Sequence, residues 1–244
     1  MRNETKFAEI YNGDCVDVLD KLQKSYRGSV DCIITDPPYN VSRETNFATL
    51  DSASRHGMDF GEWDKDFDIT KFISHASPLL KENGNFVCFN ARENLGDIKH
   101  VCEENNIYIK RCLVLNKSNP APFNRDRLFV NDVEFALWGV KNSKGNPTGW
   151  TFNRQDVFEK CCIPATVQSS VLHPTMKDLS VILRLVKILT NEGDIVLDCF
   201  MGSGTTGVAC KMLQRSFIGI ELDKGFFDIA QERLKNPVQF DLFL

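Results

Sequence analysis

Several features of membrane and secreted proteins are missing from this sequence of 244 residues. No apolar run approaches the roughly 20 residues that a membrane-spanning helix requires. The opening residues, MRNETKFAEI, lack the apolar core and cleavage site of a signal peptide. The sequence contains no low-complexity tract and no internal repeat. These absences predict a cytoplasmic protein with no membrane association.

The sequence also lacks the cysteine spacing of a zinc site. Its nine cysteines are scattered, and none forms a C-x-x-C pair. Most of them lie inside apolar segments, which is typical of buried free thiols in a reducing compartment. We therefore expect no metal site.

An overall excess of basic residues is missing too, because the net charge is −4. The segment 110–127 differs from this average, with five basic residues and one acidic residue. Such an excess has two interpretations, a solvated face or a strip that contacts phosphates. The basic residues are Lys110, Arg111, Lys117, Arg125 and Arg127.

Length and patterning indicate one α/β domain with insertions rather than two domains. Strands are predicted at 9–13, 30–35, 85–90, 107–115, 133–140, 194–197 and 217–220. Helices are predicted at 16–22, 69–80, 91–105, 176–190 and 226–234, and a further helix follows the glycine-rich segment 198–210 and ends at about Leu213. We expect a single domain over 1–244, with loop and target-recognition insertions within 41–70 and 116–172. The stretch 151–172 shows no clear period.

One predicted strand, Val30 to Thr35, ends in the tetrapeptide D-P-P-Y. Two consecutive prolines fix two φ angles and remove two backbone donors, so the strand must stop there. A carboxylate, backbone carbonyls and an aromatic ring then lie at the carboxyl end of a strand. Open α/β sheets bind their ligands at that edge.

The tetrapeptide has the chemistry to hold an exocyclic amine. The side chain of Asp36 and the carbonyl of Pro37 are two acceptors, which match the two donors of an NH₂ group. The ring of Tyr39 can stack on the flat base that carries the amine. The alternative is a strand-terminating turn in which Asp36 is a local acceptor.

A second motif lies between a strand and a helix near the carboxyl end of the chain. Gly202, Gly204 and Gly207 form G-x-G-x-x-G, and Glu221 ends the next strand. This context predicts a nucleotide site in which the backbone approaches the ligand and the acid accepts from ribose hydroxyls. A dinucleotide site fits poorly, because only 23 residues follow Glu221. A tight structural turn is the other alternative.

The two motifs resemble those of DNA amino-methyltransferases. D-P-P-Y is similar to the catalytic tetrapeptide of that family, and the run from Asp198 to Thr206 is similar to its S-adenosyl-L-methionine (AdoMet) loop. The order, with the catalytic motif first and the cofactor loop last, matches the beta group of the family. The resemblance implies a doubly wound, mostly parallel AdoMet-dependent methyltransferase sheet with circularly permuted motif order and an inserted target-recognition region.

Three further segments share this resemblance. Residues 13–15 are similar to the family's contact with the cofactor adenine, and 173–177 to the run before the helix that leads into the AdoMet loop. Residues 117–122, with Glu134, resemble a mid-chain segment. The chain departs from the pattern in having Asp178 for a usual proline and Leu115 for a frequent aromatic residue.

The resemblance implies a role for each matching residue. The catalytic residues are Asp36, Pro37, Pro38 and Tyr39. The cofactor-binding residues are Asp14, Cys15, Asp36, Thr175, Lys177, Asp198, Phe200, Gly202, Gly204, Thr205, Thr206, Glu221 and Asp223. Among these, Glu221 holds the ribose, Asp14 and Asp223 lie near the adenine, and Thr175 and Lys177 fix the methionine end. The DNA-binding residues are Lys117, Asn119, Arg125 and Arg127.

The implied reaction is methyl transfer from AdoMet to an exocyclic amine of double-stranded DNA, with the target base flipped out of the duplex. An aspartate at the first position of the tetrapeptide is more usual for N6-adenine than for N4-cytosine enzymes, so N6 of adenine is expected and N4 of cytosine is the alternative. The family occurs in restriction-modification systems. A nucleotide-binding regulatory protein without catalysis is the alternative from another class, and the intact Asp36 and Tyr39 argue against it.

The last segment carries a short motif of its own. Gln239 to Phe243 resembles the glutamine-leucine-aspartate-leucine-phenylalanine peptide by which bacterial proteins bind the replicative sliding clamp, although Phe240 replaces the usual leucine. The alternative is a tail that folds back over an apolar edge. We expect the sliding clamp and a homodimer as further partners.

Overall fold

The computed structural model describes residues 7–39, 68–120, 129–145, 159–166 and 177–235. Within them, eight strands form a single sheet in the order β1-β8-β7-β2-β3-β5-β4-β6. The strands are β1 (Ala8–Asn12), β2 (Val30–Thr35), β3 (Leu80–Asn90), β4 (Ile107–Lys117), β5 (Val133–Lys141), β6 (Cys162–Ala165), β7 (Ile195–Asp198) and β8 (Ser216–Glu221). The helices are α1 (Cys15–Tyr26), α2 (Lys71–Ala76), α3 (Leu95–Glu104), α4 (Leu179–Leu189), α5 (Thr205–Met212) and α6 (Lys224–Lys235).

The sheet is mostly parallel, as expected. Strands β1, β8, β7, β2 and β3 run parallel to one another, whereas β5 is antiparallel to both β3 and β4. The short strand β6 pairs parallel to β4 at the edge. A set of five adjacent parallel strands therefore presents its carboxyl ends on one side of the molecule.

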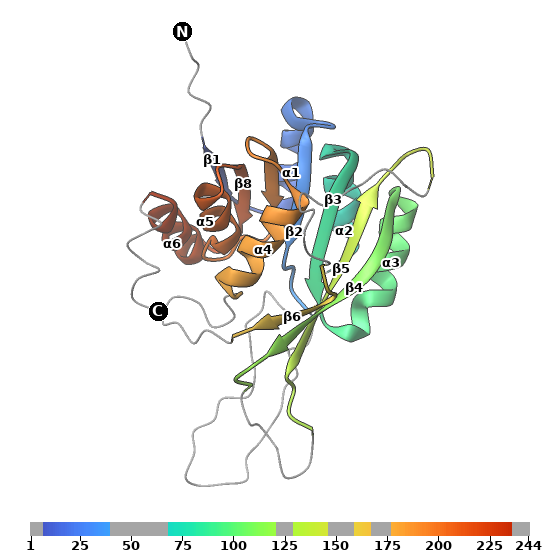
Figure 1. Ribbon diagram of the computed structural model, residues 1–244. Coiled ribbons are helices and arrows are strands. Elements are labelled where there is room, and N and C mark those ends of the chain that lie inside the picture. The colour runs from blue at the N-terminus through green and yellow to red at the C-terminus, as the bar shows by residue number, and fades with distance from the viewer. Residues whose placement is uncertain (1–6, 40–67, 121–128, 146–158, 167–176, 236–244) are drawn as a thin grey trace, which may run out of the picture.

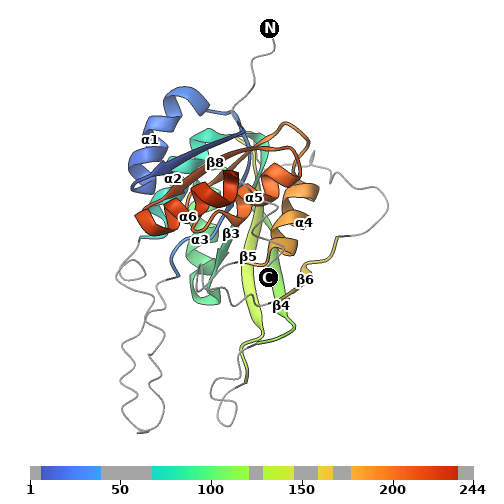
Figure 2. The same cartoon turned by 90° about the vertical axis from the view of Figure 1, so that its left-hand side faces the viewer.

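Helices cover both faces of the sheet (Figures 1 and 2). Helices α4, α5 and α6 pack on one face, and α1, α2 and α3 pack on the other. On β2, Cys32 and Ile34 lie in the first core, whereas Val30 and Ile33 lie in the second. Burial on both faces explains why this strand is a continuous apolar run. The doubly wound class is thus confirmed.

The strand order reverses between β7 and β2. From β7 the chain crosses through α5 to β8 on one side, and from β2 it continues to β3 on the other. The pairs Cys32↔Val196 and Ile33↔Leu197 join the two strands in parallel register. Ligands of open α/β sheets bind at such a switch point, and the permuted motif order still places both sequence motifs at adjacent strand ends.

The helix predicted at 69–80 is wrong in its second half. The α-helix ends at Ala76, a 3₁₀ turn follows over Ser77–Leu79, and β3 begins at Leu80. Buried residues do recur at helical spacing, but Pro78 has no N–H to continue the ladder. Asn83, with φ +63°, and Gly84 lie at an irregularity inside β3 and not at the end of a helix.

Other parts of the fold also differ from the predictions. The segment predicted as a helix from Ala91 starts as a 3₁₀ turn, and α3 begins at Leu95. Helix α4 begins at Leu179 and not at Met176, because the side chain of Asp178 caps it by accepting from Ser180 N. Strand β6 lies inside the stretch that shows no period in the sequence. No helix among the described residues is long and apolar enough to cross a membrane.

Candidate active site

The tetrapeptide follows β2 at the switch point and is held from the neighbouring strand. Nδ2 of Asn94, just after β3, donates to the carbonyl of Tyr39 at 2.8 Å and to Oδ1 of Asn90 at 2.6 Å. The same Asn90 oxygen accepts from the N–H of Ala91. These bonds hold the backbone at Tyr39, so the turn that the two prolines stiffen is fixed at its end as well.

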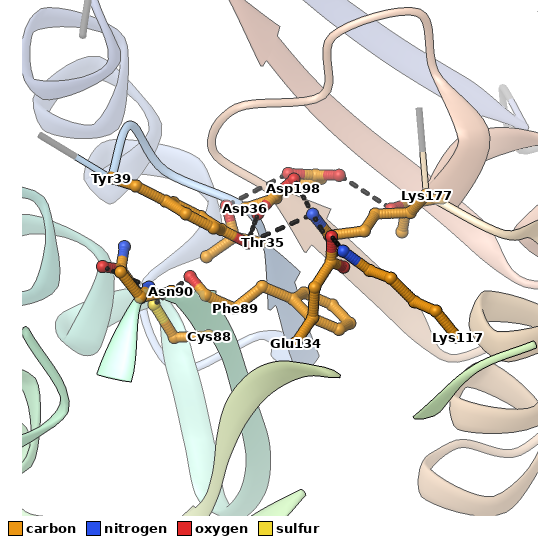
Figure 3. Close-up of polar contacts among 12 residues, drawn as sticks. Thr35, Asp36, Tyr39, Cys88, Phe89, Asn90, Lys117, Glu134, Lys177 and Asp198 are labelled. Atoms are coloured by element: carbon orange, nitrogen blue, oxygen red, sulfur yellow. Dashed lines mark hydrogen bonds and ion pairs between the residues drawn. The ribbon is translucent and has the colours of Figure 1, made fainter. Parts of the chain in front are cut away.

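Both carboxylate oxygens of Asp36 accept hydrogen bonds (Figure 3). Oδ1 accepts from the hydroxyl of Tyr39 at 2.7 Å, and Oδ2 lies 2.7 Å from Nζ of Lys177. The Lys177 ammonium also donates to the Tyr39 hydroxyl at 3.1 Å. The predicted catalytic carboxylate, the predicted stacking ring and a predicted cofactor residue therefore form one cluster.

The cluster continues to strands β4 and β5. Nζ of Lys177 lies 3.6 Å from Oε2 of Glu134, whose Oε1 lies 2.9 Å from Nζ of Lys117. The ammonium of Lys177 also lies over the rings of Tyr39 and Phe89, at 5.3 and 5.4 Å from their centroids. Two lysines and two carboxylates thus alternate from β4 to the end of β2.

Burial and charge together set the protonation of this cluster. Burial acts to lower the pKa of Lys177, but Asp36, Tyr39 and Glu134 outweigh it, so its pKa lies well above the ordinary value. Burial acts to raise the pKa of Glu134, but the two lysines outweigh it and lower the pKa. Burial, with Asp36 next, raises the pKa of Tyr39 well above its ordinary value. At neutral pH the site therefore holds an ammonium, a carboxylate at Glu134 and a neutral phenol.

The glycine loop, predicted to bind the cofactor, begins at Asp198, which is buried at the end of β7. Its Oδ1 accepts from the hydroxyl of Thr35 at 3.1 Å and from the N–H of Phe200 at 3.1 Å, and its Oδ2 accepts from the hydroxyl of Thr206 at 2.7 Å. Burial raises the pKa of Asp198 to about 7, although these bonds act to lower it. Asp198 therefore ties both ends of the glycine loop together and joins them to β2.

Two glycines of the loop are required for different structural reasons. Gly204 has φ +84° and caps α5, a backbone conformation that other residues adopt only with strain. A Cβ on Gly207 would lie 2.8 Å from the ring of Phe217, so this position is needed for close packing of α5 on the sheet. Arg233 supports the loop from below, where NH1 donates to the carbonyl of Ser203 at 2.7 Å.

Glu221 lies at the end of β8 beside this loop. Its Oε2 accepts from the N–H of Gly202 at 2.9 Å, and its Oε1 accepts from the N–H of Asp223 at 2.8 Å. Each oxygen keeps a further lone pair, so the carboxylate fits a pair of ribose hydroxyls. Burial raises the pKa of Glu221. The donor set, a carboxylate beside a glycine loop and a helix N-terminus, is chemically suited to a nucleoside.

The remaining predicted residues divide into two groups. Asp14 caps α1 by accepting from the N–H groups of Val16 and Asp17, and Cys15 is buried in the core beneath it. Thr175, Arg125, Arg127 and the segment 239–243 lie outside the described residues. Asn119 follows β4 near Lys117. No three His, Cys, Asp or Glu side chains in the described segments are grouped so as to hold a metal.

Four supporting residues were missed from the sequence: Thr35, Asn90, Asn94 and Arg233. Thr35 and Asn90 are each the last residue of a parallel strand, a position that could have marked them. Arg233 lies three residues after Ala230 on the buried side of α6. A charged residue on the apolar face of a helix could have marked it as a buried, hydrogen-bonded side chain. Among buried side-chain polar atoms of the described residues, Nδ2 of Asn90 is without a hydrogen-bond partner.

Comparison with known proteins identifies relatives across nearly the whole chain. The family model described as DNA methylase matches residues 30–232. The Type II methyltransferase M2.DpnII of Streptococcus pneumoniae is 32% identical over 90% of this chain and 87% of its own. The Type II methyltransferase M2.MboI of Moraxella bovis is 29% identical over 95% of this chain and 89% of its own.

A solved structure agrees with these relatives. The crystal structure of the M1.HpyAVI–SAM complex superposes with a TM-score of 0.73 at 35% identity, and the match covers 93% of this chain and 98% of the other. The similarity therefore extends to the fold and is not confined to the two short motifs.

Proposed function

Because the chain belongs to the DNA methylase family, we propose that it transfers a methyl group from AdoMet to N6 of adenine at a specific sequence in double-stranded DNA. The observation that carries this proposal is the placement of Asp36 and Asp198 at adjacent strand ends, with Thr35 between them. An amine-binding carboxylate and a nucleoside loop then meet at one crevice.

AdoMet supplies an electrophilic methyl group on a sulfonium. Glu221 is positioned to hold the ribose, Asp14 and Asp223 lie at the adjoining ends of β1 and β8, and the loop from Phe200 to Thr206 gives the backbone close approach. The bond between Thr206 and Asp198 fixes that loop before a ligand binds. The protein thus presents a pre-organised nucleoside site.

Asp36 and Tyr39 act on the base. The target amine must leave the duplex, since it is otherwise paired. The Asp36 side chain and the Pro37 carbonyl accept its hydrogens, which orients the nitrogen lone pair, and the Tyr39 ring stacks on the base. The gain comes from orientation and electrostatics, and no covalent enzyme intermediate is needed.

The substrate amine and the contacts to DNA belong to the same proposal. An aspartate opening the tetrapeptide favours adenine, although its chemistry serves the N4 amine of cytosine as well. Lys117, Asn119, Arg125 and Arg127 are proposed to contact the phosphates. Nine free cysteines, six of them buried, support action in the reducing cytoplasm.

The test is methyl transfer from labelled AdoMet to mixed-sequence DNA, followed by sequencing that detects modified bases. We expect label in DNA and N6-methyladenine within one short sequence. N4-methylcytosine would replace the adenine assignment, and a protein that binds AdoMet but transfers no label would be the regulatory alternative.

Two partners are part of the proposal as well. A peptide of residues 236–244 is expected to bind a bacterial sliding clamp with micromolar affinity, and Leu242→Ala with Phe243→Ala should remove that binding without lowering activity on short duplexes. Lower thermal stability with unchanged clamp binding would make the tail a structural cover. A homodimer would sediment at twice 27.7 kDa.

A further inference from the structure

The carboxylate proposed to bind the target amine is already paired within the protein. Tyr39 donates to Oδ1 of Asp36, and the Lys177 ammonium lies 2.7 Å from Oδ2. The Lys177 ammonium takes one lone pair of Oδ2 and offsets the charge of Asp36, so an amine donor that reaches this oxygen must share it with a cation. The target amine and Lys177 therefore compete for the negative charge of Asp36.

Electrostatics disfavours both cations at Asp36 together. The amine nitrogen becomes positive as its lone pair bonds the methyl carbon and the C–S bond of the sulfonium breaks to leave a thioether. A second cation at the same carboxylate repels that new charge. Lys177 also neutralises the charge on Asp36 that would stabilise the new cation. Methyl transfer is thus favoured when Lys177 has turned away from Asp36.

Glu134 is placed to receive the lysine. Among the described residues, it is the other acid within ion-pair distance of Nζ, at 3.6 Å against 2.7 Å for Asp36. Lys117 holds the far oxygen of Glu134 at 2.9 Å, so the carboxylate is oriented before the lysine moves. A small rotation of a flexible side chain exchanges the two pairs.

The surroundings keep the ammonium charged during such an exchange. The Lys177 side chain is 12% exposed and that of Glu134 27%, so solvent screens the pair only weakly. The rings of Tyr39 and Phe89 flank the ammonium at 5.3 and 5.4 Å. Aromatic faces attract a cation at these distances.

We propose that Glu134 is a positioning residue for methyl transfer, which draws Lys177 from Asp36 when the target amine arrives and so frees Asp36 to accept it. The inference rests on the proposed function, because it concerns the same amine. It gives Lys177 a task in the base site in addition to the cofactor contact expected of it.

The first test is Glu134→Gln, which keeps the shape of the side chain and removes its charge. We expect kcat on the DNA sequence found by sequencing to fall at least about tenfold, while KM for DNA and the Kd for AdoMet change little. A duplex carrying 2-aminopurine beside the target adenine, mixed with the enzyme and a non-reactive AdoMet analogue, should show a smaller rise in fluorescence, because fewer target adenines are held out of the duplex. This second measurement needs no turnover.

The second test asks whether Glu134 acts through Lys177. In a Lys177→Gln background, Glu134→Gln should have almost no effect on kcat or on the 2-aminopurine signal. Glu159→Gln is the matched control, because Glu159 is another buried carboxylate paired with a cation, Arg184. It should leave kcat and base flipping unchanged.

The outcomes separate the inference from the proposed function. A wild-type enzyme that methylates no DNA amine overturns the proposed function and the inference with it. Two results with an active wild-type enzyme overturn the inference alone. One is an unaltered kcat in Glu134→Gln, and the other is an equal loss of kcat when Glu134→Gln is made in the Lys177→Gln background. If Glu134→Gln does not fold, Glu134→Asp takes its place in both tests. We then expect a partial loss of kcat in the wild-type background and no further loss in the Lys177→Gln background.

Discussion

Thr35, the last residue of β2, donates a hydrogen bond from its hydroxyl to Oδ1 of Asp198, the last residue of β7, over 3.1 Å. The two residues are 163 positions apart in the sequence. The same hydroxyl accepts from the N–H of Cys199 at 3.2 Å. One buried side chain therefore joins the strand that ends in D-P-P-Y to the start of the glycine loop.

Thr35→Val should destabilise the fold, because it removes one of the three hydrogen bonds to the buried Asp198 carboxylate and the acceptor of the Cys199 N–H. The free energy of unfolding is expected to fall by about 1–3 kcal/mol in urea denaturation. Thr35→Ser keeps the hydroxyl and is the matched control. A valine variant as stable as the wild type would show that the bond contributes no stability.

Asp198 should make stability depend on pH. Its pKa is raised to about 7 in the folded protein, so its stabilising contribution is complete below the unfolded pKa near 4 and is lost as pH rises through 7. Between pH 5 and 7 the free energy of unfolding should fall by roughly 1.4 kcal/mol per pH unit relative to Asp198→Asn. Parallel curves for the two proteins would contradict the shift.

Asp36→Asn should lower turnover on the order of 10²-fold, because one oriented acceptor for the target amine is removed. Asparagine is preferred to alanine because it retains an acceptor for Tyr39 or Lys177. Asp31→Asn is the control on the same strand, since Asp31 pairs with Lys81 and with the N–H of Ile195. Near-normal turnover of Asp36→Asn would remove this side chain from the mechanism.

Glu221→Ala should weaken AdoMet binding and leave DNA binding unchanged. Charge-assisted hydrogen bonds contribute roughly 1.5–3 kcal/mol each, and the N–H of Gly202 also loses its acceptor. Calorimetry is expected to show a Kd raised at least about tenfold. Glu9→Ala, on the adjacent strand β1, serves as control. An unaltered Kd would exclude Glu221 from the ribose contact.

Neutralising Lys117, Arg125 and Arg127 should weaken DNA binding and reduce its salt dependence. The slope of log K against log salt should fall by about 0.9 for each phosphate that the protein no longer neutralises. Neutralising Lys110 and Arg111, earlier on β4, tests whether any removal of positive charge has the same effect. Equal binding and slope in the triple variant would make the segment a solvated face.

The elements predicted best from the sequence are those with strong local signals. The apolar run of β2 stopped by two prolines, and the glycines between β7 and α5, each specify their own local structure. Their meeting at one crevice followed from the rule that parallel strands share a ligand-binding edge. The family resemblance added the permuted order, which the β7–β2 pairing confirms.

What could not be predicted was set by tertiary contacts. Lys177 lies 138 positions from Tyr39, and no local pattern marks that contact. The helix prediction at 69–80 was wrong in its second half because the apolar spacing continued across Pro78. In the structure Leu80 pairs with Val30, so the chain forms a strand from that residue. Strand β6 is four residues long, and only its pairing with β4 defines it.

The order of strands in the sheet has a consequence for synthesis on the ribosome. Strands β1 and β2 are consecutive in the chain, yet β8 and β7 lie between them in the sheet. From Thr35 to Glu221 is 221 − 35 = 186 residues, which takes roughly 10 to 40 s to translate at 5–20 residues per second. During that interval the nascent chain carries D-P-P-Y without the loop that it must face, and both flanking strands have open edges. A product truncated before β7 therefore contains the tetrapeptide but lacks β7, β8 and the glycine loop between them.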